Sequence, residues 1–153
     1  MKKTEYTIRN ARPEDIEALT RLLQTLFAVE PDFVFNEIKQ RRGLLLMLEA
    51  SEKRRIMVAE SGGRVIGMCS AQLLISTAEG GTAALIEDLV VSEEYRGQGI
   101  GRNLLLSVED WALRQGATRL ELLADRNNTP ALEFYQKIAW RQTRLICLHK
   151  KPN

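Results

Sequence analysis

Histidine and cysteine are scarce in this sequence, and their scarcity excludes several kinds of catalytic site. The 153 residues include one histidine, His149, and two cysteines, Cys69 and Cys147, which lie far apart and have no CxxC partner. A zinc site needs several such ligands close together, and a serine nucleophile needs a histidine as its base. The sequence therefore predicts no metal site and no Ser–His chemistry, and we expect His149 to be structural or solvated.

Long hydrophobic runs and an excess of charge of one sign are also missing. No apolar segment approaches the roughly 20 residues that cross a bilayer, and the formal net charge at pH 7 is only +2. This balance argues against nucleic acid or a membrane as a partner. The first ten residues, MKKTEYTIRN, have no apolar segment behind their lysines, unlike a signal peptide. We therefore expect a cytoplasmic protein with reduced thiols.

What the sequence does contain is typical of a single globular domain over residues 1–153, since 44% of the residues are hydrophobic and 27% are charged. Hydrophobic patterning predicts strands at residues 6–11, 55–60, 65–75, 83–91, 118–124 and 143–150, the last of which would close the sheet. Helices are expected after Pro13 and at residues 36–50, 101–115 and 128–138. Antiparallel hairpins followed by a strand–helix–strand unit predict an α/β (α+β) fold, with a mixed, mostly antiparallel sheet flanked by helices.

Three glycines, Gly97, Gly99 and Gly101, stand between the strand at residues 83–91 and the following helix. Glycine lets the backbone turn tightly, and the unpaired amides at a helix N-terminus favour an anion such as phosphate. A Walker loop would need lysine after Gly101, where Arg102 stands, and a dinucleotide fingerprint would need glycine at Arg102 or at residue 104. The pattern that fits is R-x-x-G-x-G, which begins at Arg96.

At these residues the sequence resembles the GNAT superfamily of acetyl-CoA-dependent N-acetyltransferases. A second segment, NTPALEFYQKIAW at residues 128–140, is similar to the family's N-x-x-A-x-x-x-Y-x-K-x-G-F motif and matches it at Asn128, Ala131, Tyr135 and Lys137. It departs from the motif at Ala139, where the family has glycine, and at Trp140, where it has phenylalanine. An alanine there costs about 1 kcal/mol if the turn needs a positive φ. The order of elements is also similar along nearly the whole chain, so the resemblance implies a GNAT-like acyl-CoA N-acyltransferase fold.

The resemblance implies acetyl-CoA as the acetyl donor. The amides of residues 97–102 would hold its pyrophosphate, pantetheine would run along the strand at residues 89–91, and Asn128 would help to place the pantetheine arm. The residues expected to bind acetyl-CoA are Leu89, Val90, Val91, Arg96, Gly97, Gln98, Gly99, Ile100, Gly101, Arg102 and Asn128. The alternative is that the glycines form only a tight turn and that Arg96 and Arg102 are solvated.

Two residues are candidates for the proton transfers. Glu87 and Asp88 lie inside an otherwise apolar strand, where strict alternation would place Glu87 on the face of Leu89 and Val91. An acid near this position often serves as the base in the family, so we predict Glu87 as the base. In the alternative, Glu87 pairs with a cation and Asp88 caps a neighbouring group. Tyr135 is at the position of the family's usual acid, although its helical spacing also fits a core residue.

The predicted function is transfer of an acetyl group from acetyl-CoA to a primary amine, by direct attack in a ternary complex. The alternative is a non-catalytic acyl-CoA-binding or regulatory module on the same fold. In the family the acceptor pocket is lined by residues equivalent to 28–37 and 75–82. The acids Glu30, Asp32, Glu37 and Glu79 would favour a cationic amine there, unless they are merely solvated. A small molecule and a peptide both remain open as acceptor, and a homodimer remains open as the assembly.

Overall fold

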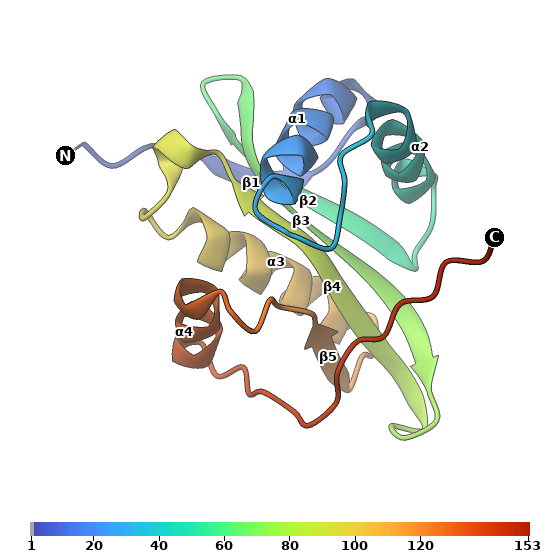
Figure 1. Ribbon diagram of the computed structural model, residues 1–153. Coiled ribbons are helices and arrows are strands. Elements are labelled where there is room, and N and C mark those ends of the chain that lie inside the picture. Colours follow the sequence, from blue (N-terminus) through green and yellow to red (C-terminus); the bar gives the residue numbers. More distant parts are fainter. Residues whose placement is uncertain (1) are drawn as a thin grey trace. The chain divides into compact units, whose positions relative to one another are not determined.

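The computed structural model describes residues 2–153 and divides them into two compact units. The first unit ends at Glu121 and holds the sheet, and the second comprises Leu122–Asn153 (Figure 1). Each unit is described by itself below. That the whole chain acts as one domain stays a prediction.

Five strands form one sheet in the order β1-β2-β3-β4-β5, which is also their order in the sequence. Neighbours from β1 to β4 pair antiparallel, as the predicted hairpins require. The turn between β2 and β3 contains Gly62 and Gly63, with φ of +54° and +75°, a conformation that favours glycine. The strands are β1 (Thr7–Asn10), β2 (Arg54–Ser61), β3 (Arg64–Ser76), β4 (Gly81–Val91) and β5 (Arg119–Leu122).

Helices cover both faces of the sheet (Figure 1). Leu19, Leu22 and Leu23 of α1 pack in one core cluster with Val58 and Met68, which point to the same face of β2 and β3. On the other face, Leu104 of α3 lies so close to Gly67 of β3 that only a small residue fits there. The helical elements are the short 3₁₀ turns η1 (Pro13–Asp15) and η2 (Glu93–Tyr95) and the helices α1 (Ile16–Phe27), α2 (Glu37–Leu48), α3 (Ile100–Arg114) and α4 (Thr129–Lys137). The predicted α/β class with a flanked sheet is confirmed.

Strand β4 contains an irregularity that the sequence did not predict. Val90 pairs with Met68, but Glu87 already pairs with Ser70, so the extra residue of a β-bulge lies between them. Asp88, in the bulge, has a φ of +52°. Strict alternation is therefore wrong here: Met68 and Ser70 share a face of β3, so Glu87 lies on the face of Val90, and not on that of Val91.

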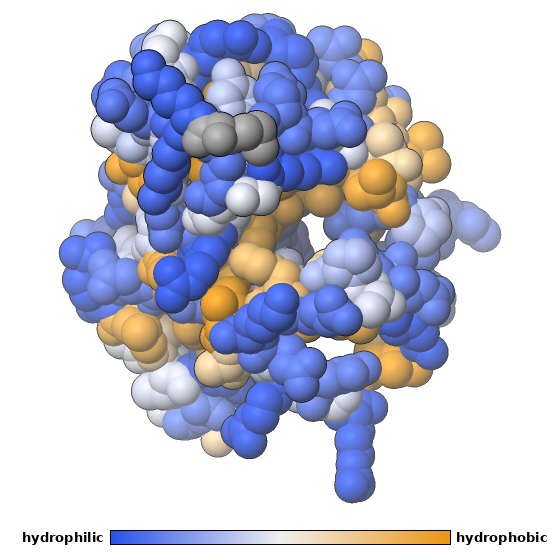
Figure 2. All heavy atoms as spheres, turned by 90° about the vertical axis from the view of Figure 1, so that its left-hand side faces the viewer, coloured by the Kyte–Doolittle hydropathy of each residue, from blue (hydrophilic) through white to orange (hydrophobic). Residues whose placement is uncertain are grey.

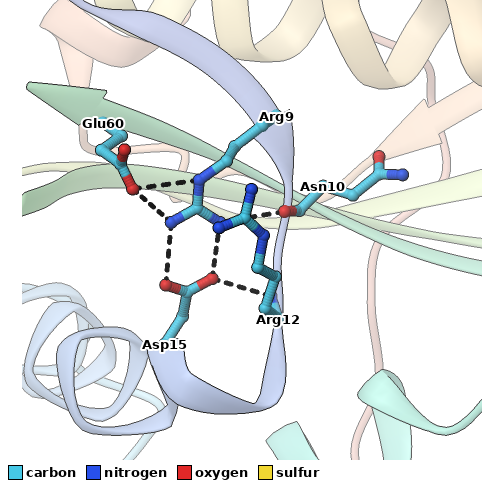
Figure 3. Close-up of polar contacts among 5 residues, drawn as sticks. All are labelled: Arg9, Asn10, Arg12, Asp15 and Glu60. Atoms are coloured by element: carbon cyan, nitrogen blue, oxygen red, sulfur yellow. Dashed lines mark hydrogen bonds and ion pairs between the residues drawn. The ribbon is translucent and has the colours of Figure 1, made fainter. Parts of the chain in front are cut away.

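A polar cluster fixes β1 to β2 and to the start of α1 (Figure 3). The guanidinium of Arg9 donates to both carboxylate oxygens of Asp15, at 2.8 and 3.0 Å, and its Nε donates to Glu60 at 3.0 Å. Asp15 also accepts from the backbone N–H of Arg12 at 2.7 Å. Hydrogen bonds from Arg9 lower the pKa of Asp15 although its burial acts in the opposite sense, and the same bonds raise the pKa of Arg9.

The strand predicted at residues 143–150 is wrong, since those residues form neither helix nor strand. Within Leu122–Asn153, α4 is the only complete regular element, so the unit offers the segment no strand to pair with. A short apolar run also fits several conformations, because it lacks the alternation of a half-buried strand. Leu145 and Leu148 remain 88% and 84% exposed.

The surface in Figure 2 is mostly hydrophilic, with smaller groups of hydrophobic side chains between the polar ones. Among residues 2–153, none of the helices combines the length and the hydropathy needed to cross a bilayer.

Candidate active site

The loop before α3 has the geometry that an anion site needs. Gly97 and Gly99 have φ of +76° and +83°, and Gly99 is the N-cap residue of the helix. A Cβ built on either would have no described atom within 4 Å, so the side on which a ligand would approach is open. Among the described residues no side chain caps this N-terminus, and its first turn carries no acid. The amides there are therefore left for an external acceptor.

Hydrogen bonds of Arg96 and Gln98 hold the loop before α3 in place. The Nε of Arg96 donates to the carbonyl of Val91 at 2.9 Å, which ties the loop to the end of β4. Gln98 accepts from the backbone N–H of Thr4 at 3.0 Å. Ile100 is fully buried, whereas Arg102 is exposed. Two predicted contact residues, Arg96 and Gln98, therefore also have structural partners.

The edge of β4 near the loop is not covered by β5. Thr118, the residue before β5, donates its N–H to the carbonyl of Thr82, near the start of β4, at 2.9 Å. The four residues of β5 reach about 13 Å, while Leu89 is about 23 Å from Thr82 along β4. Backbone groups at Leu89 and Val91 thus remain beyond the reach of β5. The side chain of Val90 is buried in the core with Met68, so only its backbone can face a ligand.

The two acids of β4 lie in different surroundings. Glu87 is exposed, whereas Asp88 is half-buried in the bulge and accepts a 3.3 Å hydrogen bond from the hydroxyl of Ser70. Burial, and next the neighbouring charge of Glu87, raise the pKa of Asp88 to about 6, although the hydrogen bond from Ser70 acts in the opposite sense. A carboxyl with this pKa can take up a proton close to neutral pH.

The sequence predicts no proton-transfer role for Asp88, which enters only as a cap in the alternative to Glu87 as the base. An acid pair in an apolar strand was a visible signal, but the choice between the two acids depends on the bulge. The same surroundings raise the pKa of the buried Cys69 thiol, mainly through burial, so this cysteine is held as a neutral thiol.

The second predicted motif forms α4 and the turn behind it. Asn128 is the N-cap of α4 and accepts from the N–H of Ala131 at 3.2 Å. The Tyr135 ring lies edge-on to that of Trp140, at 6.3 Å between centroids. Ala139 has a φ of +71°, the conformation for which the family uses glycine. Asn128 therefore has a structural role as a cap, and Ala139 carries the strain expected of a residue with a Cβ.

The acids of the predicted acceptor rim are partly neutralised. Glu79 lies 3.5 Å from Arg119 and accepts from the hydroxyl of Thr118 at 3.1 Å. Glu37 lies 4.0 Å from Arg41. The negative tendency that the sequence gives these segments is thus weaker in the structure.

The family model described as the acetyltransferase (GNAT) family matches residues 16–140. These residues include the glycine loop, both acids of β4 and α4, so the chain belongs to this family of acetyl-transferring enzymes. The resemblance inferred from the two sequence motifs is confirmed.

Relatives and solved structures agree with this assignment. An uncharacterized N-acetyltransferase of Methanocaldococcus jannaschii is 25% identical over 142 residues, which cover 92% of this chain and 63% of the relative. The chain therefore spans less than two thirds of that relative's length. A putative ribosomal protein bS18-alanine N-acetyltransferase of Bacillus subtilis is 26% identical over 137 residues, 88% of this chain and 80% of the relative. The structure of the aminoglycoside N-acetyltransferase AAC(6')-Iy in complex with CoA shares the fold, with a TM-score of 0.82 at 17% identity, covering 98% of this chain and 97% of that chain.

Proposed function

We propose that this protein transfers an acetyl group from acetyl-CoA to a primary amine, which attacks the thioester directly in a ternary complex. The observation that carries the proposal is the loop before α3, where two positive-φ glycines precede an uncapped helix N-terminus beside the end of β4. Its open side fits the pyrophosphate of CoA, for which the amides of residues 97–102 supply donors. Bound acetyl-CoA supplies the activated acetyl group.

The edge of β4 supports the second part of the cofactor site. Backbone groups of Leu89, Val90 and Val91 beyond the reach of β5 can pair with an amide-bearing chain such as pantetheine, as an added strand would. Arg96 keeps its Nε on Val91, so only the far end of its guanidinium remains for a phosphate. Asn128 is also proposed to contact acetyl-CoA.

Glu87 is the proposed base, because it is exposed and can meet an acceptor directly or through water. A neutral amine is required for attack, and a carboxylate can accept the proton that the amine loses. Asp88 is a second candidate, since its pKa is raised to about 6, which is close to neutral pH. Tyr135 is the proposed acid: a phenol with a pKa of about 10 stays protonated at neutral pH and can donate to the departing thiolate.

The acceptor is proposed at the level of a primary amine on a small molecule or a peptide. The names of the Bacillus subtilis relative and of AAC(6')-Iy state a protein alanine and an aminoglycoside as their respective acceptors. The partly neutralised acids near residues 28–37 and 75–82 give weak support for a cationic amine. The alternative, a non-catalytic acyl-CoA-binding module, shares the loop and differs in turnover.

The test is release of free CoA thiol from acetyl-CoA with a panel of amines, beside calorimetric binding of CoA. Gly99→Val should weaken CoA binding by more than about tenfold, because its side chain fills the open side of the loop. Gly63→Val is the matched control, since Gly63 also has a positive φ and open surroundings but lies in the β2–β3 turn. Equal CoA affinity in both folded variants contradicts the proposed site. CoA binding without turnover on any amine favours the alternative module.

The variant Tyr135→Phe distinguishes a catalytic role of Tyr135 as the acid from a role in packing alone. It keeps the ring against Trp140 and removes only the hydroxyl. The acid role predicts a kcat about 10²-fold lower, with CoA affinity and melting temperature close to the wild type. If kcat stays within about a factor of two of the wild type, under conditions where chemistry limits the rate, Tyr135 is not the acid and has only a packing role.

A further inference from the structure

A cavity lies within the first unit, between α3 and the β1–β2 edge of the sheet. Its volume is about 270 Å³, and its walls include Ile8, Arg55 and Met57 from the strands and Asp110, Trp111 and Arg114 from α3. Trp111 lies eleven residues after Ile100, the first residue of α3, which is about 17 Å along the helix axis. The sheet order also places two strand steps between β2 and β4. The cavity is therefore distinct from the proposed acetyl-CoA site.

Two residues of the cavity wall carry a buried hydrogen-bond donor that has no partner among the described residues. Trp111 is only 5% exposed, and its indole Nε1 has no hydrogen-bond partner among residues 2–153. The Nε of Arg55 is likewise buried and unpaired within the described chain. The guanidinium of Arg55 lies 5.4 Å from the centre of the Trp111 ring, so the two groups are neighbours. Leaving buried donors unpaired is costly, and an occupant of the cavity that accepts hydrogen bonds would remove the cost.

The charges around the cavity favour an occupant with one negative charge. Asp110 is the acid in the wall, and it already pairs with Arg114 at 2.8 Å. Arg55 is thus the wall cation without a carboxylate partner among the described residues. A single guanidinium suits a monoanion better than a phosphate dianion, for which proteins usually gather several positive groups.

The shape of the arginine donors and the apolar part of the wall indicate which kind of monoanion fits the cavity. The Nε–H of an arginine and its neighbouring N–H form a planar fork that matches the two oxygens of a carboxylate. Ile8, Met57 and the Trp111 ring supply an apolar surface next to this fork. We propose that the cavity binds a small carboxylate with a short aliphatic body, at a site separate from the acetyl-transfer site.

The experiment uses the fluorescence of Trp111. Trp111 and Trp140 are the two tryptophans of the chain, so a Trp140→Phe background reports Trp111 alone. Sodium butyrate, titrated at constant ionic strength, should produce a saturable change in emission, whereas neutral butyramide should not. Saturating CoA should leave the butyrate titration in place, since the two sites are distinct. If no saturable change occurs, the donors are merely hydrated and the proposal fails.

Variants of two adjacent arginines decide whether the signal comes from the proposed contacts. Arg55→Met should weaken butyrate binding by at least about tenfold. Arg54→Met is the matched control: it lies one residue earlier on β2, faces the other side of the sheet and lies 3.8 Å from Glu49. If Arg55→Met does not fold, Arg55→Lys keeps the charge, lacks the planar fork and should also weaken binding. Wild-type affinity in the folded Arg55 variants overturns the proposal, and so does equal loss in Arg54→Met.

Two further outcomes overturn parts of the assignment. Saturable binding of inorganic phosphate with no response to butyrate would show that the ligand class is wrong. Displacement of butyrate by CoA would show that the cavity is not a separate site.

Discussion

Asp15 lies at the start of α1 and Asp88 in the bulge of β4, and both carboxyls are partly withdrawn from water. Asp15 receives both arms of the Arg9 guanidinium and a backbone N–H, and its pKa is lowered. Asp88 has a serine hydroxyl and the like charge of Glu87 as neighbours, and its pKa is raised to about 6. A paired acid stabilises the fold, whereas an acid without a cation is destabilised when ionised and becomes available for proton transfer.

The largest effect on stability is expected at Asp15, whose carboxylate has the most complete set of hydrogen-bond partners of the two acids. Asp15→Ala removes both charge-assisted hydrogen bonds from Arg9 to Asp15 and the acceptor of the Arg12 N–H, while Glu60 still pairs with Arg9. It should lower the free energy of unfolding by about 3 kcal/mol. Chemical denaturation at neutral pH measures it. Because the Asp15 pKa is lowered, its contribution is present above the unfolded pKa and disappears as the pH falls through the folded pKa. If Asp15→Ala is as stable as the wild type at pH 7, the Arg9–Asp15 ion pair does not stabilise the fold.

The second test concerns catalysis by the acids of β4. Glu87→Gln should lower kcat by about 10²-fold near neutral pH, and the loss should shrink at high pH, where the amine is already neutral. Asp88→Asn should lower kcat by less than about tenfold if Glu87 is the base. Full pH–rate profiles of both variants measure the two effects. A wild-type profile for Glu87→Gln with a large loss in Asp88→Asn would move the base to Asp88.

The third test removes the charge of Asp88 and follows stability. The folded pKa of Asp88 is above its unfolded value of 3.8, so folding is favoured by the protonated form and loses stability as the pH rises from about 4 through 6. Asp88→Asn should therefore be about 2 kcal/mol more stable than the wild type at pH 7 and equal to it near pH 4. Asparagine also tolerates the φ of +52°. Denaturation series across this pH range measure the difference, and a constant difference at all pH values would contradict the assignment.

How much the sequence could predict differs between these two regions for a physical reason. The five observed strands, the glycine loop and α3 follow from local periodicity and turn residues, and they lie within one or two residues of the bounds predicted for them. The Arg9 cluster depends on register, because Glu60 is diagonal to Arg9 across β1 and β2. The bulge in β4 is a mismatch between two strands, so it leaves no trace in the pattern of either one.

The same reasoning explains the errors in the candidate site. Glu87 and Asp88 were both visible as acids in an apolar strand, but the bulge decides which of them is buried. The segment at residues 143–150 has strand-forming residues without a strand to pair with in its unit. Strand pairing depends on segments that are far apart in the sequence, whereas the periodicity of one segment describes that segment alone.

The smallest expected effect concerns the hydroxyl of Ser70, which is the one group that favours the ionised form of Asp88. Ser70 is buried, and its hydroxyl lies 3.1 Å from the carbonyl of Glu87 and 3.3 Å from the Asp88 carboxylate. Ser70→Ala removes this donor, so the pKa of Asp88 should rise further, by less than about one unit because the bond is long. Carbon-13 NMR titration of the Asp88 carboxyl measures the shift, and Ser76→Ala is the control, since the buried hydroxyl of Ser76 contacts Glu79 and Arg119 instead. If the pKa of Asp88 falls in Ser70→Ala, water enters the bulge when the hydroxyl is lost, and burial rather than this hydrogen bond sets the difference between Asp88 and Asp15.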